Sequence, residues 1–174
     1  MQLSAHTVNW NKLEHLRFNG SVYDAVWNSD QHLFLGAPPW PSDSCIQFSE
    51  LSECYEAIRA TVPAETRAHA DKIINKLINK SFEFPWDLAN FERTGHVIGA
   101  ISPVTVRELL QEFSRVSYAE LDEAFNFRMP PETRKSCEIA NYPSEDVFTG
   151  YLRQWENLLK YAVRREAGVL LHCG

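Results

Sequence analysis

The sequence predicts an α+β fold: a single, compact and mainly helical domain with a small mixed sheet. A long helical pattern near the C-terminus is followed by an uninterrupted apolar run at 169–171, which is typical of a strand buried on both faces. A second apolar segment, 96–101, is bounded by Gly95 and Ser102 and also predicts a strand. A chain of 174 residues is long enough for one core and too short to favour two, so we expect 1–174 to be one domain.

The long C-terminal helix is predicted at 144–165 from apolar positions that recur at three- and four-residue spacing and so share one helical face. These positions are Val147, Phe148, Tyr151, Leu152, Trp155, Leu158, Leu159, Ala162 and Val163. Ser144 is the expected N-cap, and Gly168 is expected to end the helix in the left-handed conformation. We therefore expect the helix and the buried terminal strand after it to belong to the core.

Residues 1–48 are predicted to be β-leaning and irregular. A weak helical face favours a short helix near 9–17, and β-forming residues favour strands at 21–27 and 32–35. Three prolines within 36–43 remove backbone donors, so this segment is predicted to be a loop.

Residues 49–174 are predicted to be mainly helical. Helical faces are expected on either side of Pro63, and two further helices are expected to begin at the capping residues Ser102 and Ser117. Ser117 and Glu120 have the spacing of a capping box, in which each side chain bonds the other residue's backbone amide. Because long helical connections separate the two C-terminal strands, at least one parallel pairing is expected, and the predicted sheet is therefore mixed.

The composition argues against several kinds of partner. A formal net charge of −6 disfavours a broad nucleic-acid or anionic-membrane surface. No apolar run is long enough to span a membrane, and the first residues lack the pattern of a secretory signal. The four cysteines (Cys45, Cys54, Cys137 and Cys173) are too dispersed for a CxxC pair or a compact disulfide framework. We therefore expect a cytoplasmic protein with reduced thiols that binds neither nucleic acid nor membranes.

No pattern in the sequence is typical of a catalytic, cofactor or metal site. Phosphate-binding, nucleophile-elbow and zinc-binding motifs are absent, and no histidine is followed three or four residues later by another metal-ligand residue. Acidic residues at 120–123 and 145–146 favour helix N-termini without any catalytic role. Cys137 follows Arg134 and Lys135, whose charges favour a thiolate, so Cys–His nucleophilic chemistry stays open. We predict no cofactor and no metal, and the sequence favours a non-enzymatic protein over an enzyme.

Aromatic residues of the irregular segments supply the candidate binding site. Trp27, Trp40 and Trp86 lie in weakly patterned stretches, and His96 opens the predicted strand 96–101. Large rings in such segments either fill an irregular core or line a pocket or a protein contact. We predict a binding role for these four residues, with core filling as the alternative.

The C-terminal half, about residues 95–174, carries a resemblance to a known family. Its segments are Gly99-Ala100-Ile101-Ser102-Pro103 with the helix after it, Tyr118 to Phe127, Ile139 to Pro143, the final helix, and Gly168-Val169-Leu170-Leu171. This succession resembles the YfbM-like family of uncharacterised bacterial proteins. The resemblance implies a compact α/β domain in the bacterial cytoplasm, and it implies no activity, cofactor or catalytic residue.

Two functions from different classes follow from these observations. The first is a non-enzymatic binding protein that contacts another protein, with an immunity-like role as one form, in which an acidic surface masks a basic partner. The alternative is a small-molecule enzyme that uses dispersed residues in an aromatic-lined pocket near Cys137, His96 or Trp86.

Overall fold

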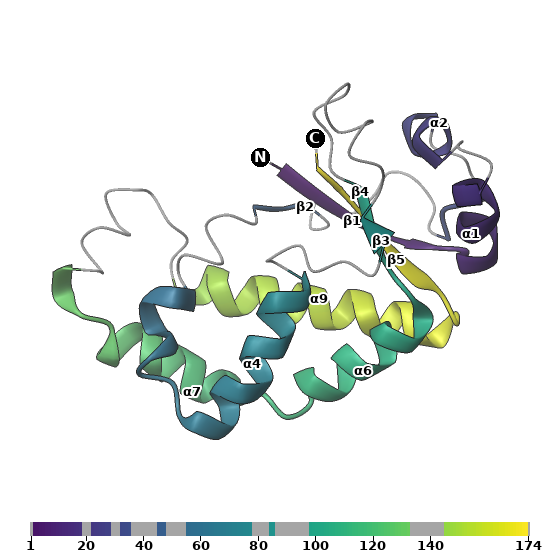
Figure 1. Cartoon of the computed structure of the whole chain (residues 1–174). Coiled ribbons are helices and arrows are strands. Elements are labelled where there is room, and N and C mark those ends of the chain that lie inside the picture. The colour runs from purple at the N-terminus through teal and green to yellow at the C-terminus, as the bar shows by residue number, and fades with distance from the viewer. Residues whose placement is uncertain are drawn as a thin grey trace.

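The computed structural model describes residues 2–18, 22–28, 32–35, 45–47, 55–77, 84–85, 98–132 and 145–173. Within these residues the strands form one sheet in the order β2-β1-β5-β4-β3 (Figure 1). The strands are β1 (Gln2–Val8), β2 (Cys45–Gln47), β3 (Phe84–Pro85), β4 (Ile98–Ile101) and β5 (Gly168–Cys173). The helices are α1 (Trp10–Phe18), α2 (Val22–Trp27), α4 (Ala64–Leu77), α6 (Pro103–Phe113), α7 (Tyr118–Glu123), the π-helical η2 (Ala124–Arg128) and α9 (Glu145–Arg164).

The fold is α+β and mainly helical, as predicted, but every strand pair within the described residues is antiparallel, so the prediction of a mixed sheet was wrong. β5 begins where β4 ends, because Ile101 lies opposite Val169 and Ile98 lies opposite His172. α6 leaves this end of β4, and α9 packs along α6 and returns to the same end (Figure 1). A connection that comes back to its starting point sends the next strand in the opposite direction, whereas a parallel pair needs a crossover to the far end.

Both faces of the sheet are covered by helices. Val169 and Leu171 of β5 join the larger core, which is formed with α4, α6, α7 and α9. Leu170, between them, joins a smaller core formed with α1 and α2. All three side chains are completely buried. The predicted burial of the terminal strand on both faces is therefore confirmed.

The long C-terminal helix is confirmed as α9, within one residue of the predicted bounds at each end. Its core-facing side chains are fully or almost fully buried; those named in the prediction are Leu152, Trp155, Leu159 and Ala162. The helix ends in a different way from the prediction. Glu166, and not Gly168, adopts the left-handed conformation, with φ of 51°.

The chain after α9 forms a Schellman motif. The amide of Ala167 donates to the carbonyl of Ala162 (2.9 Å), and the amide of Glu166 donates to the carbonyl of Val163 (3.1 Å). These two bonds place Glu166 at the position where glycine is most common. Gly168 is required for a different reason: a Cβ there would lie 2.3 Å from Cε3 of Trp10.

The predicted caps of α6 and α7 are present, but the capping box is rearranged. Ser102 Oγ accepts the amide of Thr105 (3.2 Å), and Ser117 Oγ accepts the amide of Glu120 (3.3 Å). The Glu120 carboxylate does not bond the Ser117 amide, because it accepts a hydrogen bond from Thr66 Oγ1 of α4. Thr66 Oγ1 itself accepts the Ser117 amide (3.4 Å). A residue distant in sequence therefore completes the cap.

The predicted strand at 21–27 is wrong, because this segment is the helix α2. Val22 and Ala25, three residues apart, are both buried in the smaller core with α1. This packing outweighs the β propensity of the segment. The short helix predicted near 9–17 is confirmed as α1.

The N-terminal strand β1 was not predicted, although it lies between β2 and β5 and pairs with both. The predicted strand at 32–35 is reduced to a single bridge between Phe34 and Val8. The predicted proline-rich loop at 36–43 lies outside the described residues.

Candidate functional site

The four predicted binding residues are not tested by the described part of the chain. Trp27 is the last residue of α2, and its side chain is outside the described set. Trp40, Trp86 and His96 lie outside the described residues, as does Cys137. Their binding or catalytic roles therefore remain predictions.

A small internal void lies between α4, α6 and α9. Its volume is about 10 Å³, and its lining is entirely apolar. The lining residues are Tyr55, Ala70, Ile73, Ile74, Phe113, Val116 and Leu152. A void needs roughly 10–15 Å³ and polar partners to hold one water, and ligand pockets are larger by more than an order of magnitude. This void is a packing gap and not a ligand site.

A row of polar and ionisable side chains of the described chain lies along α4. The α4 seam, as we call it, comprises Thr66, His69 and Lys72 of α4 with Glu112 of α6 and Glu120 of α7. Nδ1 of His69 lies 2.5 Å from one carboxylate oxygen of Glu112, and Nζ of Lys72 donates to the other at 2.9 Å. The hydrogen bond from His69 lowers the pKa of Glu112, with a smaller contribution from Lys72, although desolvation opposes the shift. Both oxygens of this carboxylate are therefore occupied.

A second cluster joins the helical turn at 55–59 to α4. Nε and Nη2 of Arg59 each donate to one oxygen of Asp71 at 2.8 Å, which is a bidentate pair. The Tyr55 hydroxyl donates to the same carboxylate at 2.7 Å. Burial, followed by this hydrogen bond, raises the pKa of Tyr55, and the bond from Arg59 lowers the pKa of Asp71. The cluster holds the turn against the helix.

A third cluster joins α7 to α9. The Tyr118 hydroxyl donates to Glu156 at 2.9 Å, and Lys160 approaches the other oxygen of that carboxylate at 2.6 Å. The guanidinium of Arg153 lies 4.7 Å from the centre of the Tyr118 ring, at cation–π distance. Burial is the main cause of the raised pKa of Tyr118. Like the first two clusters, this one links helical segments through carboxylates that already accept hydrogen bonds from neighbouring side chains.

The pair formed by His69 and Glu112 is the arrangement closest to acid–base chemistry, because a carboxylate can orient an imidazole as a proton acceptor. Among the described residues, however, no hydroxyl or thiol nucleophile is hydrogen-bonded to His69. The same residues contain no group of three histidine, cysteine or acidic side chains placed to hold a metal ion. The α4 seam therefore stabilises the packing of α4 on α6 and α7.

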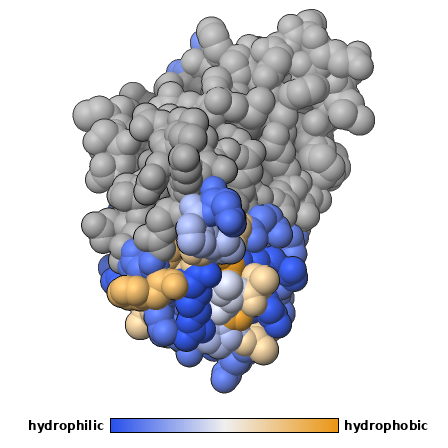
Figure 2. All heavy atoms as spheres, turned by 90° about the vertical axis from the view of Figure 1, so that its left-hand side faces the viewer, coloured by the Kyte–Doolittle hydropathy of each residue, from blue (hydrophilic) through white to orange (hydrophobic). Residues whose placement is uncertain are grey.

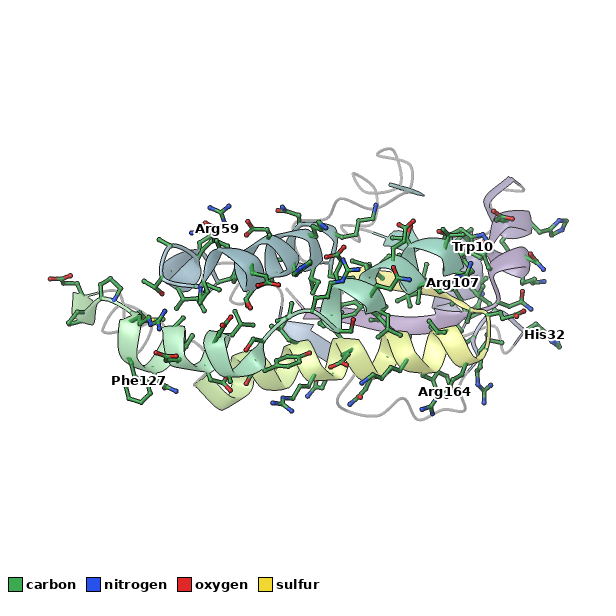
Figure 3. The ribbon with its side chains drawn as sticks, turned by 90° about the horizontal axis from the view of Figure 1, so that it is seen from below. Trp10, His32, Arg59, Arg107, Phe127 and Arg164 are labelled. Atoms are coloured by element: carbon green, nitrogen blue, oxygen red, sulfur yellow. The ribbon has the colours of Figure 1, made fainter. Side chains whose placement is uncertain are left out.

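One apolar side chain of the described surface is exposed far more than the others. Phe127 of η2 is 82% exposed, compared with 55% for Val104 and 37% for Tyr161. Its ring projects from the helical ribbon at the end of the molecule opposite Trp10 and Arg107 (Figure 3). Most of the described surface at this end is hydrophilic, with several smaller apolar patches among the polar residues (Figure 2).

Phe127 was not predicted as a surface residue, because the helix that begins at Ser117 was expected to be regular. The spacing of Leu121, Ala124 and Met129, which are all buried, is the signal that could have revealed a π-helical turn, because Met129 follows Ala124 by five residues. Such a step is invisible to an analysis based on the regular helical period.

Comparison with known structures identifies a protein of similar fold. The fold resembles that of YfbM. The crystal structure of YfbM from Escherichia coli, described as a protein of unknown function, matches with a TM-score of 0.52 at 13% sequence identity. The match covers 99% of each chain and so extends beyond the half that carried the sequence resemblance.

At this identity the likeness shows the fold alone. No family model matches the sequence, and no curated protein matches it either. None of the helices in the described segments is long and apolar enough to cross a membrane.

Proposed function

We propose that this chain is a non-enzymatic bacterial protein that binds another protein, and that the surface it meets on that partner is basic. The acid excess carries the proposal: 23 acidic residues against 17 lysines and arginines give the net charge of −6. Opposite charge on a partner accelerates encounter and disfavours wrong partners. Nucleic acids and anionic membranes would be repelled by the same charge.

Several acidic groups of the described residues join parts of the fold, and this structural role explains them without catalysis. The carboxylates of Asp71, Glu112 and Glu156 are each bonded by a tyrosine, histidine or cationic side chain of the same chain. The void between α4, α6 and α9 is too small for a metabolite. Phe127, in contrast, offers a large apolar contact to a second protein.

An immunity-like role is one concrete form of the proposal. A cytoplasmic protein of this kind would neutralise a toxic partner by covering a basic surface that the partner needs for its own activity. The alternative is a small-molecule enzyme whose residues, including Cys137, His96 and Trp86, lie outside the described segments. The close pair of His69 and Glu112 is the observation that keeps this alternative in view.

Purification of the tagged chain from its native host tests the proposal. At about 0.15 M salt, the chain is expected to bring down a basic protein in stoichiometric amount. Washing at about 1 M salt should release much of it, because the Debye length falls from about 8 Å to about 3 Å. Recovery of no specific protein at the lower salt concentration would refute the proposal.

A further inference from the structure

We propose that η2 presents Phe127 as an aromatic anchor that enters an apolar socket on the partner protein, and that lysines and arginines form the rim of this socket. The inference rests on the proposed function and deepens it by naming the contact surface. Three independent features of the described chain support it: the geometry of η2, the fixation of its end, and the charge around it.

The π-helical turn is what exposes Phe127. Leu121 and Ala124 are fully buried on the core side of α7 and η2. A regular α-helix would next place position 128, an arginine, over this face. The wider π turn instead brings Met129 into the core, where it is 5% exposed, and the ring at 127 is turned to solvent. In the π turn, methionine therefore takes the buried position that arginine would occupy in a regular α-helix, and phenylalanine is exposed.

Arg128 fixes the turn in this conformation. Its Nη1 donates to the carbonyl of Thr61 at 3.1 Å, and its Nη2 donates to the carboxylate of Glu123 at 2.7 Å. The first bond ties η2 to the segment before α4, and the second ties it to α7. A side chain held in place before binding loses less conformational entropy on association. Phe127 is thus presented on a supported turn.

The charge of the described residues on either side of Phe127 favours a basic partner; Arg134 and Lys135, which follow in the sequence, lie outside the described residues. Residues 118–132 contain four acidic side chains, Glu120, Asp122, Glu123 and Glu132, and one basic side chain, Arg128. Arg128 is paired with Glu123. A second copy of this surface, a nucleic acid or an anionic membrane would meet like charge. A protein with a basic rim around an apolar socket is the complement.

The experiment uses photo-crosslinking in the native host, with p-benzoylphenylalanine incorporated at position 127 of the full chain. The matched control carries the same group at position 104. Val104 is also exposed, and α6 begins at the end of the molecule opposite η2 (Figures 1 and 3). The crosslinked protein is identified by mass spectrometry and purified, and its affinity is measured for wild type, Phe127→Ala, Val104→Ala and Glu132→Lys.

Support for the inference requires a discrete crosslink to another protein from position 127 and none from position 104. Phe127→Ala should then weaken binding about thirtyfold or more, as loss of a hot-spot aromatic does, while Val104→Ala changes it by less than about twofold. Glu132→Lys should slow association and reduce its salt dependence. Unchanged thermal stability of Phe127→Ala would show that the loss is not caused by unfolding.

The contrary results separate this inference from the proposed function. A crosslink from position 104 alone, or a partner whose affinity is indifferent to Phe127→Ala, would overturn the η2 surface and leave a protein-binding function standing. A crosslink from position 127 to a second copy of this chain would overturn the basic partner. No crosslink from either position, together with no partner recovered by affinity purification, would refute the η2 surface and the proposed function together.

Discussion

Gly168 begins β5 beneath the indole ring of Trp10, and this contact supports a specific prediction for Gly168→Ala. The added Cβ would lie 2.3 Å from Cε3 of Trp10 and 3.0 Å from both Cζ3 of Trp10 and the carbonyl oxygen of Ile101. A distance of 2.3 Å requires movement. Either the ring swings outward and loses the 2.9 Å bond from its Nε1 to Glu14, or β5 moves away from β4.

Overpacking of this kind costs about 1–3 kcal/mol. For a chain of this size, each kcal/mol shifts the melting temperature by about 2–4 °C, so Gly168→Ala should melt roughly 2–12 °C below wild type. The assay is thermal unfolding followed by circular dichroism, with urea unfolding as a second measure of the free energy of unfolding.

Gly150→Ala is the matched control, because Gly150 lies within α9 and a Cβ there would meet nothing within 4 Å. Alanine is favoured over glycine in a helix by about 0.5–1 kcal/mol, so this variant should be more stable than wild type. The same substitution is thus expected to have opposite signs at the two positions. A Gly168→Ala protein as stable as wild type would refute the close packing of Trp10 on β5.

Three further substitutions test local features of the fold. Glu166→Gly should raise the free energy of unfolding by up to about 1 kcal/mol. A left-handed conformation costs a non-glycine residue about 1–2 kcal/mol, and the larger conformational entropy that glycine loses on folding offsets part of the gain. Glu112→Gln should lower it by about 1–2 kcal/mol at pH 7 and flatten its dependence on pH below the ordinary carboxyl pKa in chemical unfolding. Thr66→Val should lower it by about 1–3 kcal/mol, because the nearly buried hydroxyl links the Ser117 amide to Glu120.

The sign of the pH effect follows from the lowered pKa of Glu112. In the unfolded chain this carboxyl titrates near its ordinary value of 4.5, and in the folded protein it titrates lower. Its contribution is therefore present above pH 4.5 and is lost as the pH falls through the folded-state pKa. Equal pH dependence of wild type and Glu112→Gln would argue against the contact with His69 and Lys72. A destabilised Glu166→Gly protein would contradict the Schellman motif. A Thr66→Val protein as stable as wild type would contradict the rearranged cap.

The features predicted correctly from the sequence are those specified by neighbouring residues. The apolar period of α9, the run at 169–171 and the caps at Ser102 and Ser117 all depend on a few adjacent positions. The resemblance to the YfbM-like family also rests on the order of these segments, and the structural match to YfbM confirms it.

The features that were missed depend on residues distant in sequence. β1 lies between two strands that come from 45–47 and 168–173, so its pairing has no local signal. Thr66 takes the place of Glu120 in the cap only because α4 packs beside α7. The antiparallel sheet depends on where α9 returns, which no strand pattern contains.

The candidate site was the least predictable part. Sequence reasoning pointed to tryptophans of irregular segments, whose side chains are outside the described set, and it overlooked Phe127. The exposure of Phe127 arises from a π-helical step, and a hydrophobic residue in a sequence carries no mark that separates an exposed anchor from a core position.

The most direct test of protein binding is the size of the native complex in fresh lysate of the host, measured by size-exclusion chromatography at low and high salt. A binding protein with a basic partner should elute well above its own 20.0 kDa at about 0.1 M salt, and should return toward that mass at about 1 M salt. Elution at the monomer mass under both conditions would contradict the account.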